Sequence, residues 1–180
     1  TIIAQFAADV LETPIDNISV YGVDTDISPY DSGSYASSTT YLTGMAAVKA
    51  CEQLRERIIA LAAVRMNKDA SALTFDGENV IDESDGAKMS LFDIATASMC
   101  ISLEVTYSHS SPVSPPPFMA ACAEIEADPE TGAIELLDYT ACVDCGTVVN
   151  TNLARVQTEG GLLQGIGTTL FEDIWYNEKG

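Results

Sequence analysis

The stretch DSGSYASSTTYLTGMAAVKACEQLRERIIALAAVRM, residues 31–66, places a loop rich in small hydroxyl residues directly before a run of strong helix formers. From about residue 40 to residue 66, apolar residues recur at intervals of three and four, which predicts a long amphipathic helix. The apolar positions are Ala47, Ala50, Cys51, Leu54, Ile58 and Leu61. Pro29 and Gly33 are breakers, so the sequence predicts a loop that opens into this helix.

Shorter elements are predicted on both sides of the long helix. Helical spacing predicts a helix over residues 2–11, and the alternation in NISVYG (17–22) predicts a strand. ALTFDGENVID (72–82) predicts a β-hairpin, because its Asp-Gly pair can take left-handed turn positions. A short helix over residues 90–99 and a strand over residues 101–107 are expected to follow.

The second half of the chain begins with SHSSPVSPPP (108–117), which holds four of the seven prolines and predicts an irregular connection. Two long strands, 118–128 and 133–144, flank the turn PETG and predict an antiparallel hairpin. A final helix is predicted to run towards Trp175. This order of elements predicts an α+β fold, with helices packed on one face of an antiparallel sheet, as a single two-layer domain over residues 1–180.

Composition narrows the possible partners and compartment. The chain has 180 residues, 47% of them apolar, and carries 27 acidic against 8 basic residues, a net charge of −19. This charge repels phosphate backbones and anionic lipids, so neither nucleic acid nor a membrane surface is an expected partner. There is no secretory signal or long apolar run, and the odd number of cysteines favours a reduced, cytoplasmic protein. Thr1 opens directly into a helical pattern, which suggests part of a longer chain.

The hydroxyl-rich loop can bind a ligand. The first N–H groups of a helix lack intrahelical partners and lie at the positive end of the helix dipole. Such an end binds a phosphate or a polar ring edge, and hydroxyl groups add donors without positive charge. The candidate donors are Ser34, Ser37, Ser38, Thr39 and Thr40. The alternative is an ordinary N-cap, for which one hydroxyl is enough.

A second candidate surface lies in QTEGGLLQGIG, residues 157–167, where four glycines fall within eight positions of a helical pattern. Each glycine costs about 1 kcal/mol relative to alanine. Close approach of a backbone or a flat ligand is the usual reason for tolerating this cost. Gln157, Gly161 and Gln164 share one helix face, and two carboxamides beside a bare patch suit a heterocycle. Tight helix–helix packing is the alternative.

Two metal-site patterns are weaker. Cys142 and Cys145 form a CxxC pair, which can serve a metal or redox chemistry. His109 is the one histidine and is far from this pair, so both cysteines are expected at a buried strand end. The acidic spacing of DTDISPYDSGSY is similar to a calcium loop, but Tyr35 stands where a bidentate glutamate is required.

Two segments together resemble the large, molybdenum-binding subunit of the xanthine dehydrogenase and aldehyde oxidase family of molybdenum hydroxylases. VDTDISPYDSGSYASSTTYLTGMAAVKAC (23–51) resembles the family's strand end, Gly/Ser loop and long helix. AACAEIEADPETGAIELLDYTACVDCGTVVNTNLARVQTEGGLLQGIG (120–167) resembles its strand–PxTG–strand–DxG–N…QxEGGxxQGxG run. In this pattern Asp144 and Gly146 form the DxG turn and are interpreted as structural.

The resemblance implies roles for four residues. Ala36 would lie at the molybdenum centre, Ser37 and Thr39 would bind the pterin beside it, and Gln157 would hydrogen-bond the pterin through its carboxamide. Two departures are present: Ser38 stands where many relatives have arginine, and the usual Asn-Pro after the DxG strand is Asn-Thr.

No catalytic residue is expected in this segment. The resemblance places the family's Gly-Gln-Gly loop before Thr1 and its catalytic glutamate beyond Gly180, which implies an internal fragment from the C-terminal half of a larger subunit, inactive alone.

The activity implied is water-dependent oxidative hydroxylation of a heterocycle or an aldehyde. It implies a molybdopterin cofactor, in the mononucleotide or the cytosine dinucleotide form. The implied partners are the remainder of the molybdenum subunit, a small-molecule substrate, and iron–sulfur clusters and FAD on other subunits or domains. The alternative is a non-catalytic protein-interaction module that uses the glycine-rich helix as a packing surface.

Overall fold

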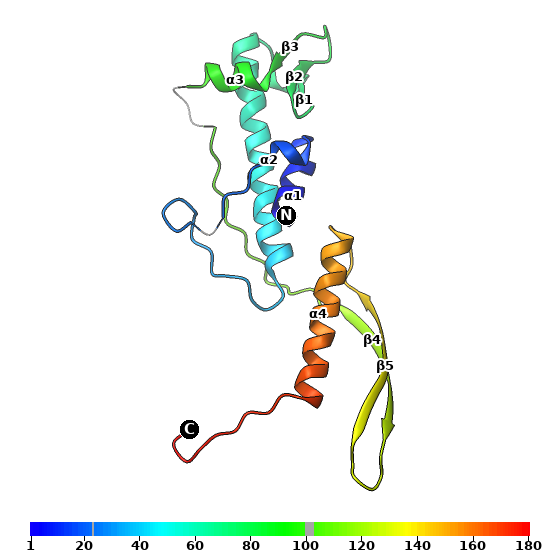
Figure 1. The fold of residues 1–180 in the computed structure, drawn as a ribbon. Coiled ribbons are helices and arrows are strands. Elements are labelled where there is room, and N and C mark those ends of the chain that lie inside the picture. The colour runs from blue at the N-terminus through cyan, green and yellow to red at the C-terminus, as the bar shows by residue number, and fades with distance from the viewer. Residues whose placement is uncertain (23, 100–102) are drawn as a thin grey trace. The chain divides into compact units, whose positions relative to one another are not determined.

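The computed structural model describes residues 1–22, 24–99 and 103–180, and the chain divides into two compact units, Thr1–Ser114 and Pro115–Gly180 (Figure 1). Helices and antiparallel strands occur in both units, which confirms the predicted α+β class. That all 180 residues act as one cofactor-binding domain stays a prediction.

The first unit is organised around α2, which spans Thr39–Met66 as predicted and ends at Asn67, a residue with a left-handed φ of 52°. The shorter helix α1, Ile2–Leu11, also matches its prediction and packs on α2. Gly44 of α2 lies under the Phe6 ring, since a Cβ at Gly44 would fall 2.5 Å from the Phe6 Cε2 atom. The missing side chain therefore lets α1 approach α2 closely.

A three-stranded antiparallel sheet follows α2 in the order β1-β2-β3. Its strands are β1 (Leu73–Phe75), β2 (Asn79–Asp82) and β3 (Lys88–Ser90). Helix α3, Leu91–Ala97, comes next, and the Asp93 N–H donates to the Ser90 side chain at its N-cap over 3.1 Å. The β1–β2 hairpin and α3 confirm their predictions, whereas β3 is too short for its sequence pattern to reveal it.

The core of the first unit lies between the C-terminal half of α2, the sheet and α3. Alternate residues of a strand point to the same face, so β1 and β2 bury one face, while the other is exposed in β1 and partly buried in β2. The buried apolar residues that form this core are Ile58, Ala62, Ala63, Leu73, Phe75, Val80 and Ile94. These residues join α2, the sheet and α3 in one core.

Two predicted strands are wrong where the structure describes them. NISVYG begins at the end of a short 3₁₀ helix, Ile15–Asn17, and residues 18–22 form no strand. Residues 103–107 form none either, while residues 100–102, which include Cys100, lie outside the described residues. Alternation alone does not make a strand, because its backbone N–H and C=O groups need a neighbouring strand.

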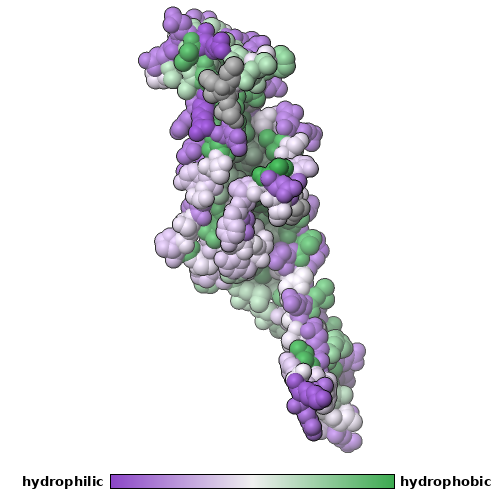
Figure 2. All heavy atoms as spheres, turned by 90° about the vertical axis from the view of Figure 1, so that its left-hand side faces the viewer, coloured by the Kyte–Doolittle hydropathy of each residue, from purple (hydrophilic) through white to green (hydrophobic). Residues whose placement is uncertain are grey.

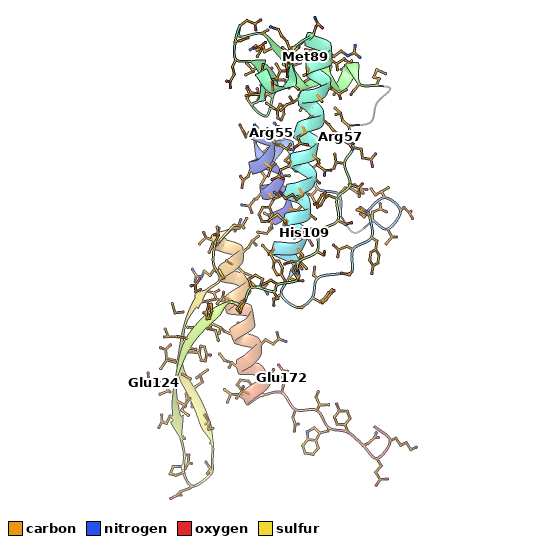
Figure 3. All side chains as sticks on the ribbon, turned by 180° about the vertical axis from the view of Figure 1, so that it is seen from behind. Arg55, Arg57, Met89, His109, Glu124 and Glu172 are labelled. Carbon is orange, nitrogen blue, oxygen red and sulfur yellow. The ribbon has the colours of Figure 1, made fainter. Side chains whose placement is uncertain are left out.

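Three arginines of α2 bind other segments through backbone carbonyls. Arg55 donates to the Phe75 carbonyl over 2.9 Å and pairs with Glu12 over 2.8 Å. Arg57 leaves α2 on the opposite side and donates to the carbonyl of Glu104 (Figure 3). Arg65 donates to the Ala97 carbonyl over 2.6 Å. These guanidinium groups join α1, the sheet, α3 and residues 103–114 to one helix.

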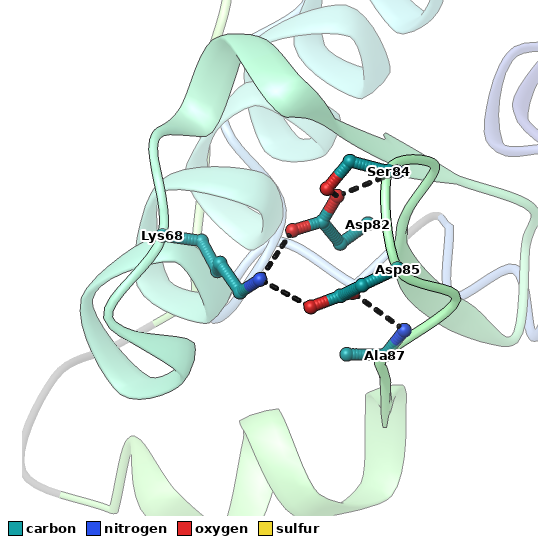
Figure 4. A network of polar contacts seen from close by, with 5 residues as sticks. All are labelled: Lys68, Asp82, Ser84, Asp85 and Ala87. Carbon is teal, nitrogen blue, oxygen red and sulfur yellow. Dashed lines mark hydrogen bonds and ion pairs between the residues drawn. The ribbon is translucent and has the colours of Figure 1, made fainter.

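Lys68 and Asp82 form an ion pair at the sheet end of α2 (Figure 4). The Lys68 Nζ atom lies 2.8 Å from Asp82 and 2.5 Å from Asp85. Asp82, only 1% exposed, also accepts from the Ser84 N–H and hydroxyl over 2.8 and 2.6 Å. The bonds from Lys68 first, and then Ser84, lower the pKa of Asp82 to about 2. Asp82 and Asp85 raise the pKa of Lys68 to about 12.

The second unit contains a long hairpin and one helix. Strands β4 (Phe118–Ala127) and β5 (Ile134–Asp144) pair along their length, with a bulge at Glu124/Ile125, and confirm the predicted hairpin. Helix α4 spans Thr151–Leu170 and is capped by Asn150, whose side chain accepts from the Leu153 N–H over 3.0 Å. It ends before Trp175, short of the predicted limit.

No residue of the second unit is buried, whereas the first unit has a buried core. Every residue of β4 is exposed, and α4 has no buried side chain. Figure 2 shows apolar residues exposed beside hydrophilic ones on the face that it draws. Across residues 1–22, 24–99 and 103–180, no helix has the length and apolarity needed to cross a membrane.

Gly77 allows the β1–β2 turn to meet the end of α1. Its φ is +93°, and a Cβ there would fall 2.0 Å from the Glu12 carbonyl oxygen. Gly77→Ala should therefore destabilise the chain by more than the ~1–2 kcal/mol of a left-handed alanine. Gly86→Ala is the matched control, because Gly86 also has a positive φ, +74°, but no atom near its missing Cβ. Equal losses in urea unfolding would contradict the close contact.

The Asp82 ion pair predicts that part of the free energy of unfolding is lost in acid. Because the folded pKa of about 2 is below the ordinary 3.8, ionised Asp82 stabilises the fold above pH ~4. That contribution is lost as the pH falls from about 4 to 2. Asp82→Asn should lower the urea midpoint at pH 6, and its difference from the unaltered protein should shrink as the pH falls through this window. A difference that does not depend on pH would argue against the pair.

Candidate functional site

A tight turn precedes α2. The Ser38 N–H donates to the Tyr35 carbonyl over 3.2 Å, and the Ser38 hydroxyl donates to the same oxygen over 2.8 Å. The two central residues, Ala36 and Ser37, have φ values of 53° and 55°. Turns with two positive φ angles normally use asparagine or glycine, and a left-handed alanine costs about 1–2 kcal/mol. Strain of this kind clusters at functional sites.

The hydroxyl of Ser38 does not cap α2. Ser38 occupies the N-cap position, but its side chain makes no capping hydrogen bond. The alternative that a hydroxyl of this loop acts as an ordinary N-cap is therefore not met by the residue at the N-cap position. The first turn of α2 has no acidic residue, so no carboxylate of that turn competes for its N–H groups. The positive end of a 28-residue helix is left with donors for another acceptor.

Three of the four glycines of α4 face open space within their unit. A Cβ at Gly160, Gly161 or Gly165 would meet no atom within 4 Å. Gln157 and Gln164 are exposed on the same helix face as Gly161. The second unit therefore contains no packed neighbour that explains the glycines as a helix–helix contact.

The structure brings three of the four predicted site residues together. Ala36 and Ser37 form the strained turn, and Thr39 is the first residue of α2, all within the first unit. Gln157 lies on the exposed surface of α4 in the second unit. A shared site for the two groups stays a prediction, as do their individual roles. The turn itself was missed, because the pair Ala-Ser has no turn signal in the sequence.

The cysteines and the DxG turn have simpler roles. Cys142 lies in β5 and Cys145 just beyond it, and both thiols are exposed, so the predicted burial is wrong. The reason is that no layer covers the hairpin within its unit. Among the described residues, no three histidine, cysteine or acidic side chains gather as metal ligands. Asp144 accepts from the Gly146 N–H over 2.9 Å, in keeping with a structural turn.

A groove of about 720 Å³ lies elsewhere in the first unit. Apolar side chains from α2, the sheet and α3 line it, including Leu54, Phe75 and Phe92. None of the predicted site residues contributes to its lining. The groove is therefore separate from the loop before α2.

Known proteins are similar to this chain in fold and in sequence. CO dehydrogenase from Oligotropha carboxidovorans superposes with a TM-score of 0.80 at 26% identity, over 99% of this chain and 23% of that one. The probable hypoxanthine oxidase XdhD of Escherichia coli (strain K12) is 35% identical over 100% of this chain and 19% of its own length. The putative xanthine dehydrogenase molybdenum-binding subunit XdhA of the same strain is 28% identical over 99% of this chain and 25% of its own.

The family of molybdopterin cofactor-binding domains matches residues 1–180. The chain belongs to this family, which confirms the resemblance seen in residues 23–51 and 120–167. It spans about a fifth to a quarter of the length of the curated relatives.

Strain in the turn predicts an unusual effect of glycine. Ala36→Gly should raise the free energy of unfolding by roughly 0.5–1 kcal/mol, because relief of the left-handed strain exceeds the added entropy of the unfolded chain. Ala60→Gly, at an exposed position inside α2, should instead lower it by about 1 kcal/mol. Urea unfolding of the two variants checks the contrast. A loss at both positions would show that Ala36 is not strained.

Proposed function

We propose that this chain is the cofactor-binding segment of a molybdenum-dependent oxidoreductase, in which the loop before α2 and the exposed face of α4 contact molybdopterin. The observation that carries the proposal is the left-handed pair Ala36–Ser37. The other described non-glycine residues with positive φ, Glu12 and Asn67, end helices. Ala36 and Ser37 are instead the positions to which the family resemblance assigns the molybdenum centre and the pterin. Ordinary packing offers no reason for their strain, since both residues are exposed.

The donors at the start of α2 fit a phosphorylated pterin. The ligand offers phosphate and ring acceptors, and the first turn of a helix offers N–H groups at a positive end. The hydroxyls of Ser37 and Thr39 add uncharged donors. No acidic side chain lies in the first turn of α2, so a protein of net charge −19 can still hold an anion there.

The α4 face fits the ring of the same ligand. The Gln157 carboxamide both donates and accepts, as the edge of a pterin requires. Gly160, Gly161 and Gly165 leave the helix surface bare, so a flat group can approach the backbone. Three helical glycines without a packed neighbour in their unit are otherwise a cost of about 1 kcal/mol each.

When bound, molybdopterin supplies the redox-active metal centre. The residues of this chain bind and orient the cofactor, and the proton-accepting glutamate is expected outside residues 1–180. The reaction we propose is water-dependent oxidative hydroxylation of a heterocycle or an aldehyde. Iron–sulfur and flavin groups on other subunits or domains would receive the electrons, and the cytosine dinucleotide form of the pterin is one candidate. Exposed free thiols suit a reducing compartment such as the cytoplasm.

A protein-interaction module is the second candidate, favoured by the absence of buried residues in Pro115–Gly180. In that case the glycine-rich face of α4 would receive another protein. The two functions differ in cofactor content, because an interaction module carries no pterin.

Gln157→Ala in the full-length protein should reduce bound pterin and molybdenum. Loss of one hydrogen bond corresponds to about a five-fold weaker affinity, so a clear deficit after dialysis is expected. Pterin fluorescence after acid release and elemental analysis measure it. Asn152→Ala is the matched control, an exposed carboxamide on the opposite side of α4. Unchanged loading of the Gln157 variant would count against the proposed contact, and an unaltered protein without pterin would favour the interaction module.

A further inference from the structure

We infer that Ser38 is a positioning residue of the cofactor site, whose hydroxyl holds the Tyr35 carbonyl and so fixes the left-handed turn of Ala36 and Ser37. The inference rests on the proposed cofactor-binding function. It adds a residue that acts through the turn rather than through contact with the cofactor.

Ser38 differs from its neighbours in burial and bonding. It is 8% exposed, whereas residues 31–37 are exposed, so its side chain lies inside the loop. Its N–H and its hydroxyl both donate to one acceptor, the Tyr35 carbonyl, over 3.2 and 2.8 Å. If the N–H alone closed the turn, one hydrogen bond would hold it instead of two. The second bond therefore opposes the tendency of two non-glycine residues to leave the left-handed region.

The same hydroxyl stands at the N-cap of α2 and is not used as a cap. Serine is a favoured capping residue, because its oxygen normally accepts from one of the first helical N–H groups. The Ser38 hydroxyl donates to Tyr35 and its oxygen accepts from none of these N–H groups, so the side chain of Ser38 leaves them available. One side-chain orientation thus sets the turn and keeps the helix end open for an acceptor.

Replacement variants of the full-length protein test the role. Ser38→Ala should release pterin about five-fold faster on dialysis, the effect expected from one hydrogen bond. Ser38→Thr keeps the hydroxyl and should retain pterin like the unaltered protein. Ser19→Ala, at an exposed serine of the first unit outside this loop, is the control and should also behave normally.

A double variant separates positioning from general destabilisation. Glycine at residue 36 takes the left-handed region freely, so Ser38→Ala should accelerate pterin release much less in the Ala36→Gly background. Shrinkage of the effect, together with rescue by threonine, supports the inference. An effect of the same size in both backgrounds, or loss of pterin from the threonine variant, overturns it.

The Gln157→Ala result keeps the two proposals apart. Normal retention by Ser38→Ala beside a deficit in Gln157→Ala overturns the role of Ser38 and leaves the cofactor-binding function standing. Normal retention by both variants overturns the role of Ser38 together with the proposed contacts.

Discussion

Burial of the C-terminal half of α2 against the three-stranded sheet is the interaction on which the first unit depends. Ile58, Ala62 and Ala63 supply the helix side of this core, and Val80 and Ile94 lie fully inside it. With about 1.5 Å per residue, a 28-residue helix is roughly 42 Å long. The sheet and α3 cover its C-terminal half, α1 packs on it at Gly44 near the other end, and the strained turn comes directly before its first residue. The three arginine contacts to backbone carbonyls tie further segments of the first unit to this helix.

The second unit has regular secondary structure but no buried core. Its hairpin and helix satisfy their own backbone hydrogen bonds, and Asn150 caps α4, but no side chain in Pro115–Gly180 is buried. An isolated two-stranded hairpin has marginal stability in water. The apolar residues along β4 and the bare glycine face of α4 thus supply surface rather than core. This property agrees with a segment that binds something outside its own unit.

Sequence reasoning succeeded where a pattern was long or chemically specific. The period of three and four predicted α2 almost to the residue, and the Asp-Gly and PETG turns predicted both hairpins. It failed for residues 18–22 and 103–107, where alternation had no neighbouring strand to pair with. It also failed for the turn before α2. The backbone angles of Ala36 and Ser37 come from bonds to Tyr35 and not from the preferences of alanine or serine. A left-handed alanine has no signature in a single sequence.

The distance along α2 between the loop before it and the core at its C-terminal half has an evolutionary consequence. Substitutions at sites far apart and without shared partners change stability nearly independently. The loop at residues 31–38 can therefore diversify while Ile94, Val80 and their neighbours stay under a separate packing constraint. Related proteins with this fold can therefore change the ligand that the loop before α2 binds while the core of the first unit stays the same.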